Sequence, residues 1–563
     1  VANGDAIRVL RSSFADNDGW NYGGAISAET SGSSTLDHVT FARNRNTADS
    51  GGGAVYIDSR PDDTADLTVT NTTFTGNVSA YGSALNVEDL RDVTIERTVF
   101  TGNRGTEGVF AVGPRVDATI RQSAIVANES TVTSRGGNGG VLVWTGANLT
   151  VENSTIADNV IADDLSADVR GAALRVHNGT VSLSSVTIAG NVNTAASGGA
   201  GGVFIEDDVP AVVGITATNS IIAGNSDKDG PANCGAVTAV AGRLDLLGAG
   251  VLGVDCGATS GDGITVTDDP KLDTLRESPM VDGDGVTWIR PLSVTSPALD
   301  AGETALTVDQ RGVARPQGSA ADVGAVEMRP AALGVALVGP DEPVAVGAKA
   351  TLRAVARNRG DFPTSASTFA LTLPSTMLRF GTALDGASCS ASAEGARCAL
   401  GVLQGDEELP IGITADALAA GSAEAVAALS ATGLATARAT ATVGIVGGSG
   451  GGSGVATGVC VRTTVRPRAG SPRRARLTCR ITLHRVGAYA IRVPKPSGSW
   501  KIAAGSRVAG TKLRTPKARV TTKNERVDRR IVVKLLVPRG ARWAPVVITL
   551  TDASGRRTTT RIG

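Results

Sequence analysis

An asparagine placed three residues after a large apolar residue recurs along the first 225 residues, and this repeat constrains the fold most strongly. The eight pairs are Phe14/Asn17, Phe41/Asn44, Phe74/Asn77, Phe100/Asn103, Ile125/Asn128, Ile156/Asn159, Ile188/Asn191 and Ile222/Asn225. Successive asparagines lie 27, 33, 26, 25, 31, 32 and 34 residues apart. Repeats of about 20 to 50 residues are typical of solenoids, in which each coil buries its apolar face against its neighbours.

The segments between these asparagines read as short strands. Upstream of each asparagine, apolar residues stand two positions apart, as Leu67 and Val69 do, which indicates a strand with one inward face. A second strand opens with a glycine-containing signal such as Gly52-Gly53-Ala54-Val55. No helix-length segment intervenes. The sequence therefore predicts an all-β chain that begins with a right-handed parallel β-helix, whose coils stack at about 4.8 Å.

The eight asparagines are predicted to form a structural ladder in this β-helix. Each stands at a turn, where its side chain is expected to bond the backbone of the coils above and below. Such bonds would satisfy amides that the turn leaves unpaired. We therefore assign these asparagines no ligand-binding role.

Length variation is concentrated in the turn that follows each asparagine. Its long members, 128–140, 159–172 and 191–202, belong to consecutive coils and are predicted to stack on one edge. Insertions gathered on one face of a solenoid often form its binding surface. Asp163, Asp164, Asp168 and Arg170 in the middle loop are the candidate ligand-binding residues. The alternative is that these loops are solvated and bind nothing.

The titratable residues do not group into a catalytic pattern. His38, His177 and His484 are scattered, and the paired aspartates stand in turns where solvated charge is usual. Trp144 is assigned to the inward column of Ile57, Val87, Val112 and Val176, so no aromatic row for sugar stacking is expected. The segment 282–285 (DGDG) hints at Ca²⁺ but lacks the later Glu of an EF-hand loop. We predict no catalytic residue, no metal ligand and no cofactor, with Ca²⁺ as the alternative.

Changes in composition and residue pattern along the chain predict five parts. They are coils (1–225), an irregular C-terminal cap of the β-helix (226–329), an Ig-like β-sandwich (330–444), a Gly/Ser linker (445–454) and a basic β-rich domain (455–563). The cap is expected to cover the open end of the β-helix, because bare edge strands invite aggregation.

The zero net charge conceals an asymmetry. From residue 455 onward 26 Lys and Arg face three acids, a charge of +23, and the rest of the chain carries −23. A basic module of this kind is predicted to bind an anionic cell-wall polymer or lipid headgroups. Nucleic acid is disfavoured, because only Tyr489, Trp500 and Trp543 could stack on bases.

The six cysteines form three local pairs without zinc-type spacing. Cys234 with Cys256, Cys389 with Cys398, and Cys460 with Cys479 are predicted disulfides, which indicates an extracytoplasmic location. No run approaches the about 18 apolar residues of a transmembrane helix. The chain starts at Val1 without Met or leader, which suggests either a removed signal peptide or a fragment.

Two segments resemble known families. The motifs at 296–302 (SPALDAG), 308–316 (VDQRGVARP) and 322–327 (DVGAVE) resemble the choice-of-anchor Q domain, which closes right-handed β-helix proteins of the bacterial surface. The order of 358–360 (NRG), 371–374 (LTLP), Cys389, 398–401 (CALG) and 403–405 (LQG) resembles the DUF11/CARDB-like, Ig-type surface repeat. The resemblance implies a pectin lyase-like solenoid in a secreted or surface protein and supplies no catalytic residue.

Together these features predict a bacterial secreted or cell-surface protein that binds or displays a glycan or surface ligand in the manner of an adhesin, without catalysis. The alternative is an extracellular polysaccharide lyase or glycoside hydrolase acting on an acidic polysaccharide. That enzyme would need acidic or Arg side chains that converge in one groove from adjacent coils.

Overall fold

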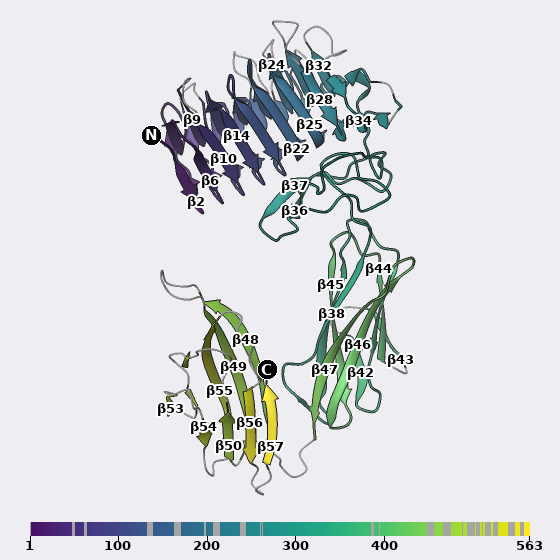
Figure 1. Cartoon of the computed structure of the whole chain (residues 1–563). Helices are drawn as coiled ribbons and strands as arrows, with labels where there is room; N and C mark the ends of the chain where they lie inside the picture. The colour runs from purple at the N-terminus through teal and green to yellow at the C-terminus, as the bar shows by residue number, and fades with distance from the viewer. Residues whose placement is uncertain are drawn as a thin grey trace. The chain divides into compact units, whose positions relative to one another are not determined.

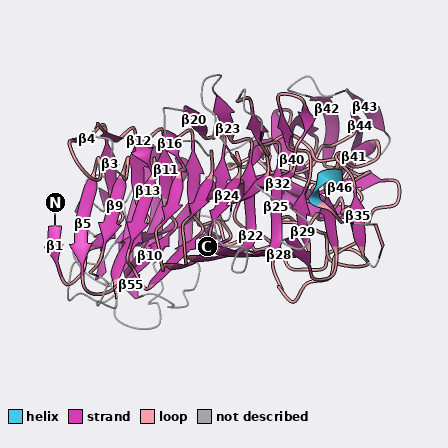
Figure 2. Cartoon of the chain, turned by 90° about the horizontal axis from the view of Figure 1, so that it is seen from above, coloured by secondary structure: helices cyan, strands magenta, loops and turns pink. Residues whose placement is uncertain are grey.

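The computed structural model describes residues 2–447 apart from 48–50, 61–64, 132–138, 163–169, 196–198, 207–213, 237–243, 259, 262, 384–387 and 393–394; beyond residue 454 it describes strands without their side chains. The regular secondary structure of the described chain is nearly all strand, as Figure 2 shows, and η1 (Val254–Cys256) is its one assigned helix. The predicted all-β class is confirmed. No helix among the described residues is long and apolar enough to cross a membrane. The chain divides into two compact units, Val1–Pro330 and Ala331–Gly563.

Three sheets of stacked strands form the first unit (Figure 1). Sheet A contains β1 (Ala2–Gly4), β5 (Ile26–Thr30), β9 (Val55–Asp58), β13 (Leu85–Glu88), β17 (Phe110–Val112), β21 (Val141–Val143), β24 (Leu174–His177), β27 (Val203–Glu206) and β32 (Cys234–Ala236). Sheet C contains β4 (Asp18–Gly19), β8 (Arg45–Asn46), β12 (Val78–Tyr81), β16 (Arg104–Glu107), β20 (Glu129–Thr131), β23 (Val160–Ala162), β26 (Val192–Asn193), β30 (Ser226–Asp227) and β31 (Gly230–Pro231).

Sheet B is the longest of the three, because each coil contributes two strands or one long strand to it. It contains β2 (Arg8–Leu10), β3 (Ser13–Ala15), β6 (Ser34–Asp37), β7 (Thr40–Ala42), β10 (Asp66–Thr70), β11 (Thr73–Thr75), β14 (Asp92–Glu96), β15 (Val99–Thr101), β18 (Asp117–Arg121), β19 (Ala124–Val126), β22 (Asn148–Ala157), β25 (Thr180–Ala189), β28 (Gly214–Thr218), β29 (Ser220–Ile222), β33 (Leu244–Leu246), β34 (Gly250–Leu252) and β35 (Ile264–Val266). The chain passes through sheets B, C and A in each coil, and neighbouring coils pair in parallel.

The interior is built from columns of apolar side chains, one per coil. Val69 is the register partner of Leu36 on one side and of Ile95 on the other, and all three are fully buried. The phenylalanines that precede the asparagines also stack, with ring centroids 5.2, 4.9 and 4.8 Å apart from Phe14 through Phe41 and Phe74 to Phe100. The repeat in the sequence is thus the repeat of a continuous core.

The asparagines form an unbroken ladder of hydrogen bonds beside this core. The backbone N–H and Nδ2 of Asn77 both donate to Oδ1 of Asn103 at 2.9 Å, and Nδ2 of Asn103 also donates to the carbonyl of Phe74 at 3.0 Å. The same pattern runs from Asn17 to Asn225 and continues to Asn233. Asn233 is a ninth rung that the sequence reading missed, because the short hairpin of β30 and β31 places it only eight residues after Asn225.

The ladder lies inside the solenoid, and its side chains bond both the backbone of neighbouring coils, as expected, and one another. The rungs that are at most 1% exposed include Asn44, Asn128, Asn159 and Asn191. Nδ2 of each donates to Oδ1 of the next asparagine at 2.9 to 3.0 Å and to a main-chain carbonyl of the preceding coil at 2.9 to 3.1 Å. Side chains at one position of successive coils lie within reach of one another, so each amide serves both its neighbour and the backbone. Buried and bonded in this way, these asparagines are not available to a ligand.

The glycine signal before each sheet A strand has a steric origin. Gly52 has a φ of +79°, which side chains other than hydrogen rarely tolerate, and a Cβ on Gly53 would lie 1.9 Å from the carbonyl oxygen of Ser83 in the next coil. The chain therefore turns tightly into sheet A only where the residues are small.

Residues 226–329 do more than cover the end of the solenoid. The strands β32 to β35 continue the coils, and the disulfide of Cys234 with Cys256 joins β32 to η1. Residues 270–328, the return segment, then run back along the outer face of sheet B and include the hairpin of β36 (Arg276–Pro279) and β37 (Val286–Ile289), which Figure 1 shows beside the solenoid strands. Trp288 packs there on an outward apolar cluster of sheet B.

The second unit contains a two-sheet sandwich. One sheet holds β38 (Leu333–Val338), β40 (Lys349–Asn358), β42 (Leu378–Ala383) and β45 (Glu408–Ala417); the other holds β39 (Val344–Ala345), β41 (Ser367–Thr372), β43 (Cys389–Ser392), β44 (Gly395–Gly401), β46 (Gly421–Ala431) and β47 (Ala437–Val446). One buried cluster draws on both sheets, with Leu352 and Ile411 from the first and Phe369 and Leu429 from the second. A disulfide joins Cys389 to Cys398 across β43 and β44.

Beyond residue 454 only strand pairing is described. The strands are β48 (Val455–Val465), β49 (Arg474–Val486), β50 (Ala488–Arg492), β51 (Lys501–Ile502), β52 (Arg507–Val508), β53 (Thr511–Lys512), β54 (Arg519–Thr521), β55 (Val527–Pro538), β56 (Val546–Thr551) and β57 (Arg557–Ile562). The antiparallel register of β48 and β49 makes Cys460 and Cys479 partners, but their side chains lie outside the described residues.

Candidate functional site

A groove of about 360 Å³ lies on the outer face of sheet A. The described residues that line it come from five successive coils and are Tyr22, Gly51, Tyr81, Asn86, Glu88, Ala111, Gly113, Pro114 and Trp144. The small residues on β17 and in the turn after it leave the space, and the aromatic side chains stand around it. Ligand sites are commonly concave, with apolar and aromatic walls and few polar groups.

Trp144 is part of this groove and not of the core, so the sequence reading was wrong on this residue. Register pairs Val112 with Val143 and Val143 with Val176, which places Val143 in the inward column and Trp144 just beyond it. Gly139 and Gly140 directly precede β21, whereas one residue separates Gly52 and Gly53 from β9. Aligning the two coils on their glycines therefore shifts β21 by one residue. The side chain of Trp144 is half-buried and meets the ring of His177 edge-on at 5.4 Å.

No aromatic row for sugar stacking was expected, and the structure brings three aromatic side chains from different positions of their coils to one groove. Tyr22, Tyr81 and Trp144 come from the loop after β4, from the end of β12 and from the turn after β21, and they share one groove. Tyr22 stacks in turn on Tyr56 with ring centroids 4.4 Å apart. These residues occupy different positions in their coils, so they do not recur at a fixed spacing and the repeat does not predict their grouping.

A pair of carboxylates adjoins the groove. Asp58 and Glu88 are register partners on β9 and β13, so one coil stacks one directly over the other. The hydroxyl of Tyr56 lies 3.0 Å from Oε2 of Glu88 and 3.3 Å from Oδ2 of Asp58. The remaining oxygens accept from the N–H of Ser59, at 2.7 Å, and from Nδ2 of Asn86, at 3.0 Å. All of these donor groups around the pair are neutral.

Burial and nearby negative charge raise the pKa values of Asp58 and Tyr56. Burial raises the pKa of the Asp58 carboxyl, and the nearby charge of Glu88 acts in the same direction, against the hydrogen bonds from Ser59 and Tyr56. Burial, together with the charges of Glu88 and Asp58, also raises the pKa of the Tyr56 hydroxyl, so this hydroxyl remains a donor. Among the described residues that line the groove, Glu88 is acidic and none is basic.

The loop residues predicted to bind ligand are only partly described. Asp163, Asp164 and Asp168 lie outside the described residues. Arg170 is described, and its Nη1 lies 3.3 Å from Oε1 of Glu206, which also binds Arg175 at 2.6 Å. The guanidinium of Arg170 lies over the ring of Phe204, 5.1 Å from its centroid. Arg170 thus takes part in an ion-pair cluster on sheet A at the coils beyond Trp144.

Sheet B presents a covered face. One residue per coil, between the two halves of each sheet B segment, adopts a φ between 43° and 55°: Arg11, His38, Asn71, Arg97, Gln122, Asn153, Ser185 and Asn219. Several of these side chains hold the return segment. Arg97 binds Asp282 at 2.6 Å, and Nε2 of His38 lies 3.3 Å from Asp284, so the two acids of the DGDG segment contact the solenoid. A smaller cavity of about 190 Å³ lies between them.

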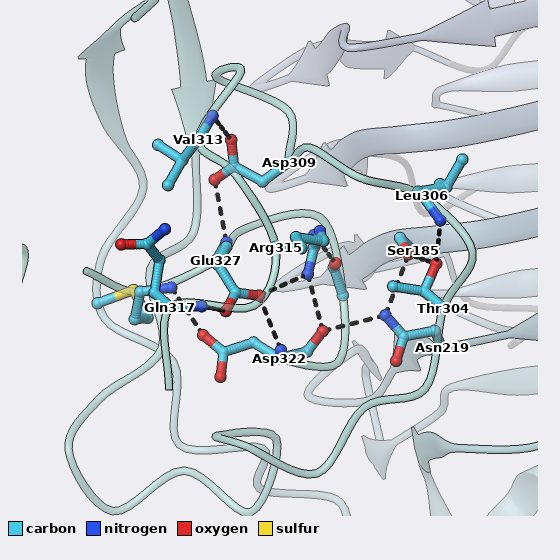
Figure 3. A network of polar contacts seen from close by, with 12 residues as sticks. Ser185, Asn219, Thr304, Leu306, Asp309, Val313, Arg315, Gln317, Asp322 and Glu327 are labelled. Carbon is cyan, nitrogen blue, oxygen red and sulfur yellow. Dashed lines mark hydrogen bonds and ion pairs between the residues drawn. The ribbon is translucent and has the colours of Figure 1, made fainter. Parts of the chain in front are cut away.

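The motifs of residues 308–327 form the buried part of this contact. Asp309, Arg311 and Glu327 are fully buried, and Asp309 accepts from the guanidinium of Arg311 at 2.9 Å and from the N–H of Glu327 at 3.0 Å. Arg315 binds Glu327 at 3.1 Å. Figure 3 shows the part of this network around Asp309, Arg315 and Glu327, where Nδ2 of Asn219 on the solenoid donates to the carbonyl of Asp322. These charges bond one another and the backbone, so we assign them a structural role.

Gln310 completes the contact with the solenoid. Its amide oxygen accepts from the hydroxyl of Thr155 at 2.6 Å, and its Nε2 donates to the hydroxyl of Thr287 at 2.7 Å. One buried side chain thereby joins sheet B to the hairpin of the return segment. Within the described part of the chain, no group of three His, Cys, Asp or Glu side chains is arranged to hold a metal ion.

Comparisons with known proteins bear on the solenoid alone. No curated protein matches the sequence. Solved structures with partial similarity include a CARDB domain from Pyrococcus furiosus in complex with di-metal ions (15% identity, 20% of this chain and 93% of that chain, TM-score 0.15) and the adhesin InvE of Yersinia pseudotuberculosis (14%, 40% and 58%, TM-score 0.13). The C-terminal domain of the Streptococcus agalactiae AgI/II polypeptide BspA is also similar (9%, 40% and 98%, TM-score 0.14). Such low scores define neither fold nor function. Residues 54–246, less than half of the chain, match the family model of the right-handed β-helix region, in agreement with the coils described above.

Proposed function

We propose that this chain is a secreted or surface-displayed protein that binds a glycan chain in the groove of sheet A and does not cleave it. The observation that carries this proposal is the gathering of Tyr22, Tyr81 and Trp144 from three coils around one groove. The C–H face of a sugar ring carries partial positive charge and packs on the negative face of an aromatic ring. Asn86 and Glu88 supply hydrogen-bonding groups beside these rings.

The proposed secreted or surface location rests on the disulfides. Two disulfides, Cys234–Cys256 and Cys389–Cys398, are formed in the described residues, and disulfides persist mainly in oxidising compartments. The resemblance of 296–327 to the choice-of-anchor Q domain points the same way. In this proposal the basic residues beyond 454 attach the chain to an anionic cell-wall polymer or to lipid headgroups.

Binding of the full chain to immobilised chitosan, cellulose and pectate tests the proposal. Trp144→Ala and Tyr81→Ala should each weaken binding at least tenfold, because each removes a stacking surface. The matched control is Leu247→Ala, an exposed apolar side chain that does not line the groove. Equal binding by wild type, both groove variants and the control would exclude the groove as the site.

One observation favours glycoside hydrolysis as a second candidate. Asp58 and Glu88 are adjacent carboxyls on successive coils, and the raised pKa of Asp58 suits a general acid, with Glu88 as the second carboxyl that glycoside hydrolysis uses. Release of reducing ends from the same polysaccharides, abolished in Asp58→Asn and in Glu88→Gln, would establish this activity. Binding without such release supports the binding role.

A further inference from the structure

The carboxylate pair beside the groove has too few donors for its charge. Tyr56 carries a single hydroxyl proton, so it can donate to Glu88 or to Asp58 but not to both at once. Whichever carboxylate is not served then faces a hydroxyl oxygen. A positively charged donor placed between the two acids would resolve this arrangement, because it could bond both.

Two described basic side chains of these coils form ion pairs with other acids. Arg60 on the coil of Asp58 binds Glu29 at 2.8 Å, and Arg115 binds Asp89 at 2.6 Å. Glu88 is the one charged residue among the described residues that line the groove. The groove therefore combines Glu88, whose register partner Asp58 adjoins it, with three aromatic side chains, and aromatic faces attract cations as well as sugar C–H groups.

We infer that the groove of sheet A selects a glycan of amino sugars with free, protonated amino groups, such as a de-N-acetylated glucosamine chain. This inference rests on the proposed function and specifies its ligand. The amine of one sugar unit donates to Asp58 and Glu88, and the neighbouring rings pack on Tyr22, Tyr81 and Trp144. A uronate polymer meets like charge at the same place, so the acidic polysaccharide of the alternative prediction is the ligand that this groove disfavours.

Titration of the full chain with three hexasaccharides at low ionic strength tests the inference. The probes are hexamers of glucosamine, of N-acetylglucosamine and of galacturonic acid. We expect the glucosamine hexamer to bind wild type at least tenfold more tightly than the N-acetylated hexamer, and the uronate hexamer to bind most weakly. Added salt should weaken binding of the glucosamine hexamer and leave binding of the N-acetylated hexamer nearly unchanged.

Variants separate the charge from the stacking surface. Glu88→Gln keeps an acceptor for Tyr56 and should weaken binding of the glucosamine hexamer about tenfold, and binding of the N-acetylated hexamer by a clearly smaller factor. Asp58→Asn should act in the same direction, and their circular dichroism checks the fold. The control is Glu29→Gln, a sheet A carboxylate already paired with Arg60, which should change neither affinity.

The outcomes test the amino-sugar ligand separately from the glycan-binding proposal on which it rests. Equal affinity of wild type for all three hexamers, with loss of binding in Trp144→Ala, would keep glycan binding and overturn the amino-sugar ligand. Unchanged affinity in Glu88→Gln and no salt effect on wild type would also overturn it, and the salt measurement needs no variant. If no hexamer binds, or if Trp144→Ala binds as wild type does, the glycan-binding proposal itself fails.

Discussion

Sheet A and sheet B belong to the same coils and share one core, yet their outer faces differ. The return segment covers part of the outer face of sheet B, whereas the outer face of sheet A holds an open groove. On sheet B the outward residues Val99, Ala124, Val126 and Ala157 are small and apolar, and the return segment covers them with Leu275 and Trp288. On sheet A the outward residues include Asn86 and Glu88, which line an open groove. The inward columns maintain the solenoid, so the outward positions are free to differ between its faces.

The charged side chains of the two faces also differ in how they are paired. Within the return segment Asp309, Arg311, Arg315 and Glu327 are buried and bonded to one another. Beside the groove the pair of Asp58 and Glu88 has neutral donors only. A buried network in which each charge has partners maintains a fixed contact, whereas unneutralised charge at a groove favours a ligand of opposite sign.

Removing a partner from the covered face should have the largest effect on stability. Arg311→Met leaves Asp309 buried without its cation and should lower the free energy of unfolding by about 3 to 5 kcal/mol. Urea denaturation of the full chain, followed by tryptophan fluorescence, measures this. The matched control is Arg60→Met, which breaks an exposed pair beside sheet A and should cost less than about 1 kcal/mol. Similar losses in both variants would contradict the contrast between the faces.

The pH dependence of stability should also come from the covered face. Burial raises the pKa of Asp322 to about 6, against the N–H groups of Met328 and Asp300, which favour its charged form. The folded chain therefore keeps this proton between about pH 4 and pH 6, where the unfolded chain has released it. Stability contributed by Asp322 is present at pH 4 and is lost as the pH rises to 6, by on the order of 2 to 3 kcal/mol.

The difference between wild type and Asp322→Asn isolates that contribution, because the other carboxyls titrate equally in both. We expect urea midpoints measured from pH 4 to pH 7 to fall more steeply with rising pH in wild type than in the variant. Parallel curves would show that Asp322 has an ordinary pKa in the folded chain.

Two tryptophans compare the faces directly. Trp288→Ala removes the half-buried ring that packs on sheet B and should lower the free energy of unfolding by about 2 kcal/mol, with glycan affinity unchanged. Trp144→Ala should cost about 1 kcal/mol or less in stability and at least tenfold in glycan affinity. Denaturation and glycan titration on both variants give the four values. The reverse assignment, with Trp288 needed for binding, would place the ligand on the other face.

The smallest effect is expected at the tip of the hairpin. Arg97 and Asp282 are both partly exposed, so Arg97→Ala should cost less than about 1 kcal/mol, and the cost should decline with added salt. Hydrogen exchange of peptides spanning 280–286 at low and high salt measures this loosening. Arg104→Ala, which breaks an exposed pair with Glu129 on sheet C, should leave those peptides unchanged.

The coils could be predicted from the sequence because inward residues recur at one position in each coil. Leu67, Val69, Phe74 and Asn77 keep fixed spacing, since each must meet its counterpart in the coils above and below. Asn233 broke that spacing and was missed, although it continues the same ladder. The periodic part of the fold is thus the part that stacking dictates.

The groove could not be predicted in this way, because its residues obey no common spacing. Tyr22 and Tyr81 lie in the approach to sheet A, whereas Trp144 follows its strand, and an alignment error of one position moved Trp144 into the core. A one-residue shift exchanges the two faces of a strand. The resemblance of 296–327 to a surface domain likewise did not reveal that Gln310 joins this segment to Thr155 along the side of sheet B.

Hydrogen exchange of the full chain with and without the glucosamine hexamer tests most directly whether the groove of sheet A is the binding face. The account predicts slower exchange in peptides that cover 20–24, 81–88, 110–114 and 141–146, with no change in 270–328. Protection confined to the loops 128–140, 159–172 and 191–202, or to the residues beyond 454, would contradict it.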